Sequence, residues 1–171
     1  MLNVKEKSAV NNLSSLYNTD YYTWAMTNAE LLKEGKLNEI DYINLAEEVR
    51  DLGNSEYYRL VSFLANLLSH VYKWDNQPEL RTKSWKVTII NSISDITLTL
   101  RRNPGLKYEP VFSEAFAEVW KKARNIIYAD TELEYIPESS PYMFKDAINK
   151  ASEIVPDKIS KSDIFFLNNL F

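Results

Sequence analysis

Residues 56–85 read EYYRLVSFLANLLSHVYKWDNQPELRTKSW, and this stretch decides how the rest of the chain is interpreted. On a helix that turns about 100° per residue, the apolar residues of 56–75 form one broad arc. They are Tyr57, Leu60, Val61, Leu64, Leu67, Leu68, Val71 and Tyr72. The polar residues form a single narrow stripe of Arg59, Ser62, Asn66, Ser69 and Lys73. A helix with so narrow a polar stripe is covered on most sides, so we predict a central buried helix near 56–75.

The pattern on both sides of this stretch is helical as well. Apolar residues recur every three or four positions in five further segments, and prolines or glycines fall at the ends of these segments. The segments are about 20–33, 41–53, 82–102, 110–129 and 140–150. In this interpretation Gly53 ends one helix and Asn54 or Ser55 caps the central one. We therefore predict an all-α fold, a single-domain bundle of about five to six helices.

The same pattern predicts how the chain is divided. Residues 1–16 are only weakly amphipathic and are expected to form an N-terminal arm, followed by the helical bundle domain over 17–150. Residues 151–171 form a C-terminal extension that ends in IFFLNNLF. That ending is too apolar to remain in water, so we expect it to pack on the body of the protein or on another chain.

Composition excludes several classes of function. The chain has no cysteine, which excludes disulfides, thiolate zinc sites and cysteine nucleophiles. It has no apolar run of the roughly 18–20 residues that a membrane span needs, so we expect a cytoplasmic protein without membrane partners. The net charge of −4 argues against a general nucleic-acid binder. Residues 73–107 are nevertheless rich in Lys and Arg, which leaves an RNA-binding role open.

His70 is the only histidine and lies where the apolar arc meets the polar stripe. An imidazole at such a margin changes its charge near neutral pH and can act as a general acid or base. Glu48 or Glu56 would then orient it; Glu47 points about 100° away from Glu48 on a helix, so the two cannot form a carboxylate pair. The alternative is a structural histidine that donates to a backbone carbonyl and packs against Trp74, one turn later.

Five nearby residues are candidates for binding. Lys73 and Arg81 carry the positive charge that an anion would need, and Trp74, Gln77 and Trp85 flank them. We expect Trp85 to face inward, because it leads the apolar stripe of its helix. No metal is predicted, since the di-iron pattern Glu-x-x-His has Leu67 in place of the glutamate. No cofactor is predicted either, because no glycine-rich phosphate loop occurs.

Four motifs occur in a specific order: LAEEVRDLG (45–53), HVYKWDNQP (70–78), SW (84–85) and PESSPY (137–142). With them the chain resembles the domain of unknown function 29 family, over roughly residues 15–150. The resemblance implies a compact helical bundle, frequent in bacteria including cyanobacteria, and it implies no activity. The family positions it carries over are Glu47, Glu48, Gly53, His70, Trp74, Gln77, Pro78 and Trp85. Ser140 stands where the family often has cysteine, which argues against thiol chemistry as a shared function.

These observations favour a helical protein that serves as a non-enzymatic protein-interaction or regulatory module. The abundance of apolar and aromatic residues and the absence of a complete catalytic set support it, and it implies a protein partner or a homo-oligomer. One alternative is a small hydrolase or nuclease-like enzyme that uses His70 with Glu48 or Glu56. Another is an RNA-binding domain that uses residues 73–107. The sequence leaves open whether the protein is an enzyme.

Overall fold

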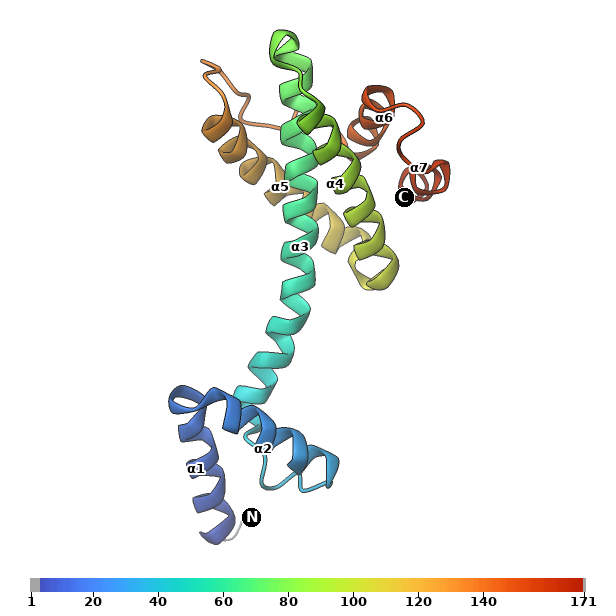
Figure 1. The fold of residues 1–171 in the computed structure, drawn as a ribbon. Helices are drawn as coiled ribbons and strands as arrows, with labels where there is room; N and C mark the ends of the chain where they lie inside the picture. Colours follow the sequence, from blue (N-terminus) through green and yellow to red (C-terminus); the bar gives the residue numbers. More distant parts are fainter. Residues whose placement is uncertain (1–3, 171) are drawn as a thin grey trace. The chain divides into compact units, whose positions relative to one another are not determined.

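The computed structural model describes residues 4–170, with the side chains of 12–109 and 111–170. These residues form seven α-helices and two short 3₁₀-helices, with no strand among them, which confirms the all-α prediction (Figure 1). The α-helices are α1 (Val4–Thr19), α2 (Tyr21–Lys33), α3 (Tyr42–Asn76), α4 (Lys83–Arg102), α5 (Glu109–Asp130), α6 (Phe144–Ile154) and α7 (Lys161–Asn168). The 3₁₀-helices are η1 (Pro78–Leu80) and η2 (Pro104–Lys107).

The chain divides into two compact units, residues 1–54 and residues 55–171. In the first unit α1 and α2 pack together, and α2 begins where the sequence predicted, because the Asp20 carboxylate accepts from the backbone N–H of Thr23 at 3.1 Å. The interior of this unit is largely polar. Trp24 Nε1 donates to Asp41 Oδ2 at 3.0 Å, and the backbone N–H of Asp41 donates to Asn28 Oδ1 at 2.9 Å. All three of these side chains are buried.

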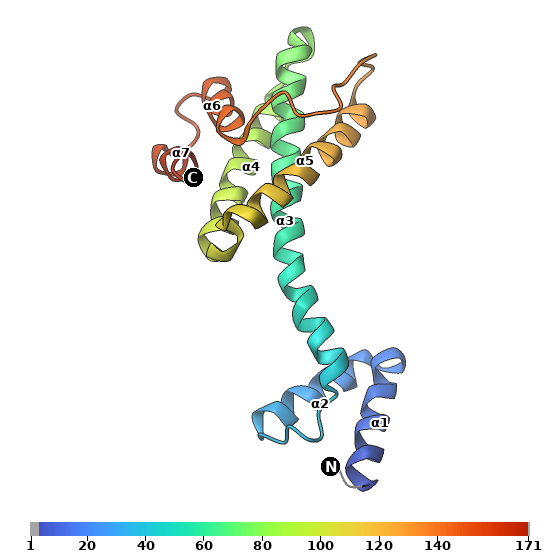
Figure 2. The same ribbon diagram turned by 180° about the vertical axis from the view of Figure 1, so that it is seen from behind.

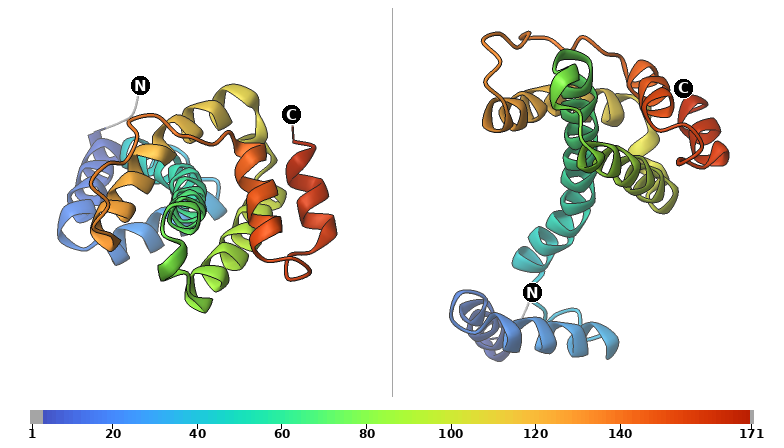
Figure 3. Two further views of the ribbon diagram at one scale, coloured as in Figure 1. Left: turned by 90° about the horizontal axis from the view of Figure 1, so that it is seen from above. Right: turned by 45° about the horizontal axis from the view of Figure 1, so that its top comes forward.

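The second unit has an apolar core built on the C-terminal part of α3. The views of Figures 2 and 3 place α4 and α5 on different sides of this helix, with α6 and α7 beyond α4. Buried residues of α3 pack against those of α4 and α5, which confirms the predicted central helix. The three sets are Leu60, Leu64, Leu67, Leu68 and Val71; Ile89, Ile93, Ile96 and Leu100; and Ala115, Val119, Ala123 and Ile127.

The C-terminal extension packs on the body of its own unit. α7 contacts α4 and α6, and its Leu167 is fully buried. Arg101 of α4 pairs with Asp163 at 3.0 Å, and its guanidinium lies 5.0 Å from the centre of the Phe166 ring. The apolar ending is therefore covered partly by side chains and partly by a cation over an aromatic ring.

Two predicted helix boundaries are wrong. Gly53 lies inside α3, so the two helices predicted over 41–53 and 56–75 are one continuous helix. A single glycine in an open position costs a helix only about 1 kcal/mol, which the packed turns that follow can offset. The sixth helix was predicted to begin at Ser140-Pro141, but α6 begins at Phe144. The Ser140 hydroxyl instead closes a local turn, accepting from the N–H of Tyr142 at 3.2 Å and donating to its carbonyl at 2.8 Å.

Candidate functional site

The last turns of α3 carry most of the residues that the sequence singled out. His70, Lys73, Trp74 and Gln77 follow one another around the end of this helix. Pro78 then begins η1, because proline has no N–H with which to continue the helix. The chain turns back into α4, which returns alongside α3 and brings Trp85 next to Lys73. The site is thus a helix end covered by the beginning of the next helix.

Lys73 is the centre of this arrangement. Its side chain is only 2% exposed, and its Nζ lies 2.6 Å from Oδ2 of Asp130 at the end of α5. The same ammonium lies 5.2 Å from the centre of the Trp85 ring and 3.4 Å from Nε2 of His70. An ammonium removed from water needs such partners, since an unpaired buried charge is strongly unfavourable. The carboxylate, the ring face and the imidazole together replace its lost hydration.

These contacts determine the protonation of His70. Its Nδ1 lies 2.9 Å from the backbone carbonyl of Asn66, which can only accept, so Nδ1 carries the proton. Nε2 then presents its lone pair to the Lys73 ammonium. Burial lowers the pKa of His70 below its ordinary value, the nearby Lys73 charge lowers it further, and the bond to Asn66 and the charge of Asp130 oppose these effects. The histidine is therefore held neutral in one tautomer.

Two cations lie close to the ring of Trp74. The Arg81 guanidinium is 4.8 Å from the centre of its ring, and the Lys86 ammonium is 5.2 Å from the same centre. Arg81 Nε also donates to the backbone carbonyl of Trp74 at 2.9 Å, which satisfies one of the carbonyls left open at the helix end. Arg81 therefore acts as a clamp on the end of α3, and its charge is directed at the ring.

The connection between α5 and α6, residues 131–143, passes across this helix end (Figure 3). Two hydrogen bonds hold it: Trp120 Nε1 donates to the carbonyl of Pro137 at 3.0 Å, and the Tyr142 hydroxyl donates to Asp75 Oδ2 at 2.8 Å. Lys150 pairs with the same Asp75 oxygen at 2.7 Å. Burial raises the pKa of Tyr142, and the hydrogen bond to Asp75 raises it further. The PESSPY motif is thereby fastened to the helix end.

Gln77 occupies a different position from the other candidates. It lines an open cavity of about 460 Å³ together with Leu80 and the segment 129–133. Its Oε1 is buried and accepts no hydrogen bond from a described residue. Asp130 lines the same cavity, so one carboxylate contributes both to this cavity and to the Lys73 pair.

Both glutamates have partners other than His70. Glu48 belongs to the first unit, where both of its oxygens accept from tyrosine hydroxyls, Tyr17 and Tyr21, at 2.7 Å each. Glu56 pairs with Arg59 at 2.8 Å and accepts from Asn103 at 2.9 Å. It precedes His70 by fourteen residues in α3, which separates them by about 21 Å along the axis of a helix that rises about 1.5 Å per residue. This separation leaves Glu56 too far along the helix to orient His70, and orientation by Glu48 stays a prediction.

The structure thus brings His70, Lys73 and Trp85 together and joins Trp74 to Arg81, while Gln77 lines a separate cavity. Sequence reasoning missed Asp130, whose position at a helix end carries no local signal for a partner 57 residues away. It also missed Tyr142, although the PESSPY motif that contains this residue had been recognised.

Most basic side chains of residues 73–107 have a partner inside the protein. Among the described residues, no three Asp, Glu or His side chains are grouped as metal ligands. Of the seven basic residues in 73–107, five contact a ring or a carboxylate within the protein. They are Lys73, Arg81, Lys86, Arg101 and Lys107. The arrangement suits a structural role better than proton transfer.

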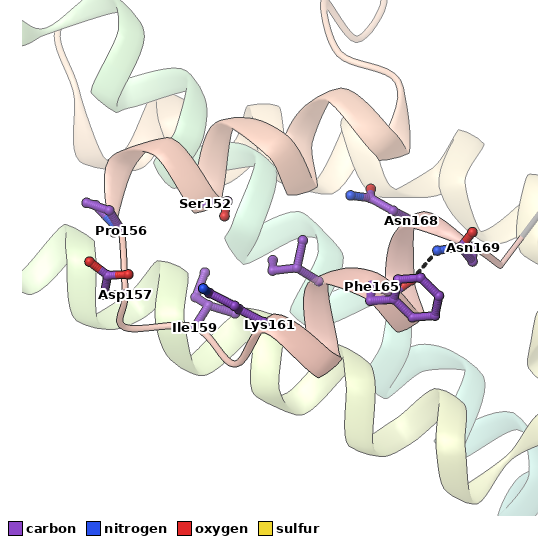
Figure 4. A pocket seen from close by; sticks show the side chains of 9 residues that line it. Ser152, Pro156, Asp157, Ile159, Lys161, Phe165, Asn168 and Asn169 are labelled. Carbon is purple, nitrogen blue, oxygen red and sulfur yellow. Dashed lines mark hydrogen bonds between the residues drawn. The ribbon is translucent and has the colours of Figure 1, made fainter.

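A further cavity of about 530 Å³ lies between α6 and α7 (Figure 4). Pro156, Ile159 and Phe165 give it an apolar wall, and Asp157 and Lys161 stand at its edge. The Asn169 side chain donates to the carbonyl of Phe165 at 2.7 Å and closes one end of the short helix. This cavity lies in the C-terminal extension, away from the motifs.

A comparison with protein families places most of the chain in one family. Residues 16–151 match the family described as Domain of unknown function DUF29, and the match includes all four motifs. No curated protein and no solved structure matches the chain. No helix within residues 4–170 combines the length and apolar character that crossing a membrane requires. Because the match spans most of the chain and includes the whole helix end described above, the chain belongs to the DUF29 family.

Proposed function

We propose that this chain is a non-enzymatic protein-interaction module whose first unit pairs with the first unit of a second copy. The observation that carries the proposal is the surface of α3 in that unit. Tyr42, Leu45, Val49 and Leu52 are spaced three, four and three residues apart and form one stripe, which we call the α3 stripe. Tyr42 is 66% exposed and Val49 64% exposed.

The first unit has little apolar core of its own. Among its described apolar side chains, only Leu13 and Trp24 are buried. Its exposed large apolar residues are Tyr21, Tyr22, Met26, Leu32, Leu37, Tyr42, Ile43, Val49 and Leu52. Each of them is at least 42% exposed, so apolar side chains make up much of the surface of this unit. A unit of this size with so small a core gains stability when a partner covers such a surface.

The spacing of the α3 stripe favours a second helix as the partner. Apolar residues at alternating intervals of three and four are the pattern with which helices pair side by side. The same stripe on two copies can meet across a two-fold axis, so one surface is sufficient for a closed dimer. The neutral, internally bonded His70 and the occupied Glu48 and Glu56 give less support to the acid/base alternative.

Sedimentation equilibrium of the full chain at several protein concentrations tests the proposal. Residues 1–54 contain nine Asp or Glu and five Lys or Arg, so two first units repel each other. We expect a dimer that tightens as salt rises, because apolar burial persists while this repulsion is screened. Val49→Glu should weaken the dimer by about tenfold or more, since it places a charge in the interface. Val87→Glu is the matched control, an identical change at a 45% exposed position of α4.

Three outcomes would overturn the proposal. The first is a monomer at the highest soluble concentration in both low and high salt. The second is a dimer that Val49→Glu and Val87→Glu weaken equally, because the interface would then lie elsewhere. The third is a dimer that dissociates as salt rises, because attraction between charges and not the α3 stripe would hold it together.

A further inference from the structure

A cavity of about 580 Å³ lies beside α5 in the second unit. One face of α5 forms its wall with Phe116, Ala117, Trp120, Lys121 and Arg124, which recur at helical spacing. The segment 138–140 forms the opposite side. The volume is within the range of small-molecule sites in proteins, about 300–1,000 Å³. We call this the α5 cavity.

The walls of the α5 cavity are held in place before any ligand arrives. Trp120 is buried, and its Nε1 is bonded to the carbonyl of Pro137, which fixes the segment against the helix. The Ser140 hydroxyl is used within its own turn with Tyr142. Preorganised walls of this kind reduce the ordering that binding would otherwise require.

The cavity has an excess of positive charge. Neither Lys121 nor Arg124 takes part in any ion pair found among the described residues, although Glu138 also lines the cavity. The Arg124 guanidinium packs 5.7 Å from the centre of the Tyr128 ring and donates to its hydroxyl at 3.4 Å. Its Nε is buried and has no acceptor among the described residues. The guanidinium charge is paired with no carboxylate among the described residues, which favours an oxyanion that can accept from its exposed edge.

The remaining surface of the α5 cavity is apolar or weakly polar. Phe116 and Ala117 offer carbon surface next to the two cations, and Ser139 is an exposed hydroxyl at the opposite side. Arginine and lysine together bind oxyanions through charge-assisted hydrogen bonds, and a ring next to them accommodates an apolar body. The lining thus combines an anion-binding end with an apolar end.

We propose that the α5 cavity binds a small organic anion, with its carboxylate or phosphate between Lys121 and Arg124 and its apolar body against Phe116. This binding is independent of pairing through the α3 stripe, since every residue that lines the cavity belongs to the second unit. The ligand chemistry is that of an aryl or short alkyl acid. The anionic group could be either oxyanion, and the test distinguishes the two.

The test is an NMR titration of the uniformly ¹⁵N-labelled full chain with four probes: benzoate, phenyl phosphate, inorganic phosphate and benzamide. Benzamide has the shape of benzoate without its charge. We expect benzoate or phenyl phosphate to shift the indole N–H of Trp120 and the amides of 138–140 saturably. Benzamide should bind about tenfold more weakly, because it forms no charge-assisted hydrogen bonds. The stronger of the two anions identifies the oxyanion that the cavity prefers.

Three substitutions locate the binding. Arg124→Gln and Lys121→Gln should each weaken the binding of the preferred anion by about tenfold. Lys122→Gln is the matched control, because it removes the same charge from the next position of α5, where Lys122 Nζ donates to Ser62 at 2.8 Å. Lys121 is exposed, so its variant tests the proposal even where Arg124→Gln perturbs folding. Equal binding of benzoate and benzamide, no saturable shift with any anion, or an equal loss in Lys122→Gln would overturn the proposal.

Discussion

Replacing Asp130 with asparagine should show how much the stability of the second unit depends on pairing the buried Lys73. Lys73 is 2% exposed, and its Nζ lies 2.6 Å from the Asp130 carboxylate. Asparagine keeps the size of the side chain and removes its charge. The ammonium would then be left with the Trp85 ring and the neutral His70 as its remaining contacts. The substitution removes an ion pair from the native state and changes the free energy of the unfolded state very little, so the free energy of unfolding falls.

The magnitude follows from the geometry. At the 2.6 Å separation the Coulomb attraction is about 1.6 kcal/mol in water and about 6 kcal/mol at the effective dielectric constant of about 20 used near protein surfaces. Asp130 is 46% exposed, so water screens the pair from one side. Loss of one partner of a fully buried pair costs about 3–5 kcal/mol, and the exposed carboxylate reduces that figure. We expect the free energy of unfolding to fall by about 2–3 kcal/mol in Asp130→Asn.

Urea unfolding followed by circular dichroism measures the loss, and a double-mutant cycle assigns it to the pair. Lys73→Met alone removes the buried charge and leaves a half-exposed aspartate, so we expect a loss of about 1 kcal/mol or less. In the Lys73→Met background, Asp130→Asn should then cost almost nothing. A loss below about 0.5 kcal/mol for Asp130→Asn, or strict additivity of the two substitutions, would refute the account of Lys73 as a buried charge that needs this partner.

Three further results are expected. The pKa of His70 is lowered in the folded state, so as pH drops below about 6.5 the unfolded chain binds a proton before the folded chain does, and the free energy of unfolding falls. His70→Asn should therefore lose less stability than the wild type between neutral pH and pH ~5. An equal loss in both proteins would count against a neutral histidine. The hydrogen bond to Glu48 raises the pKa of Tyr17 to about 12. In Glu48→Gln the pKa of Tyr17, followed by NMR through its ¹³Cζ signal, should fall toward about 10. An unchanged pKa would show that Glu48 does not set it. Gly53→Ala should raise the free energy of unfolding by about 0.5–1 kcal/mol, because the site is helical and open. Gly35→Ala should lower it by about 1 kcal/mol, because φ at Gly35 is 72°. Equal effects of the two substitutions in urea unfolding would contradict these backbone conformations.

The parts of the fold that follow from local pattern were predictable. The apolar arc of residues 56–75 identified the central helix, and Thr82 and Pro110 marked the beginnings of α4 and α5. The failure at Gly53 has a physical cause. Glycine followed by Asn54 and Ser55 is a common end-and-cap pattern, but propensity is weak, and packing farther along α3 extends the helix through it.

Only the residues that α3 and the start of α4 contribute to the candidate site were predictable from the sequence. His70, Lys73 and Trp85 were recognisable because helical spacing places them around one helix end, and that end meets the next helix after a short turn. Asp130 was not recognisable, since its contact with Lys73 depends on where α5 ends in space and not on any nearby residue. The same limitation hid the α5 cavity, whose far side comes from residues 138–140.

The charged and polar side chains at the end of α3 differ from the proposed binding surfaces in having partners inside the protein. His70 and Lys73 have partners inside the protein, and Arg81 is directed at a tryptophan ring, so these motif residues use their polar groups to hold the helix end together. We propose that binding occurs instead at the α3 stripe and in the α5 cavity. Three residues of the α3 stripe, Tyr42, Val49 and Leu52, are exposed, and the buried Nε of Arg124 has no acceptor among the described residues. A substitution at Lys73 should therefore change stability far more than binding, whereas Lys121→Gln should change anion binding and leave the unfolding free energy nearly unaltered.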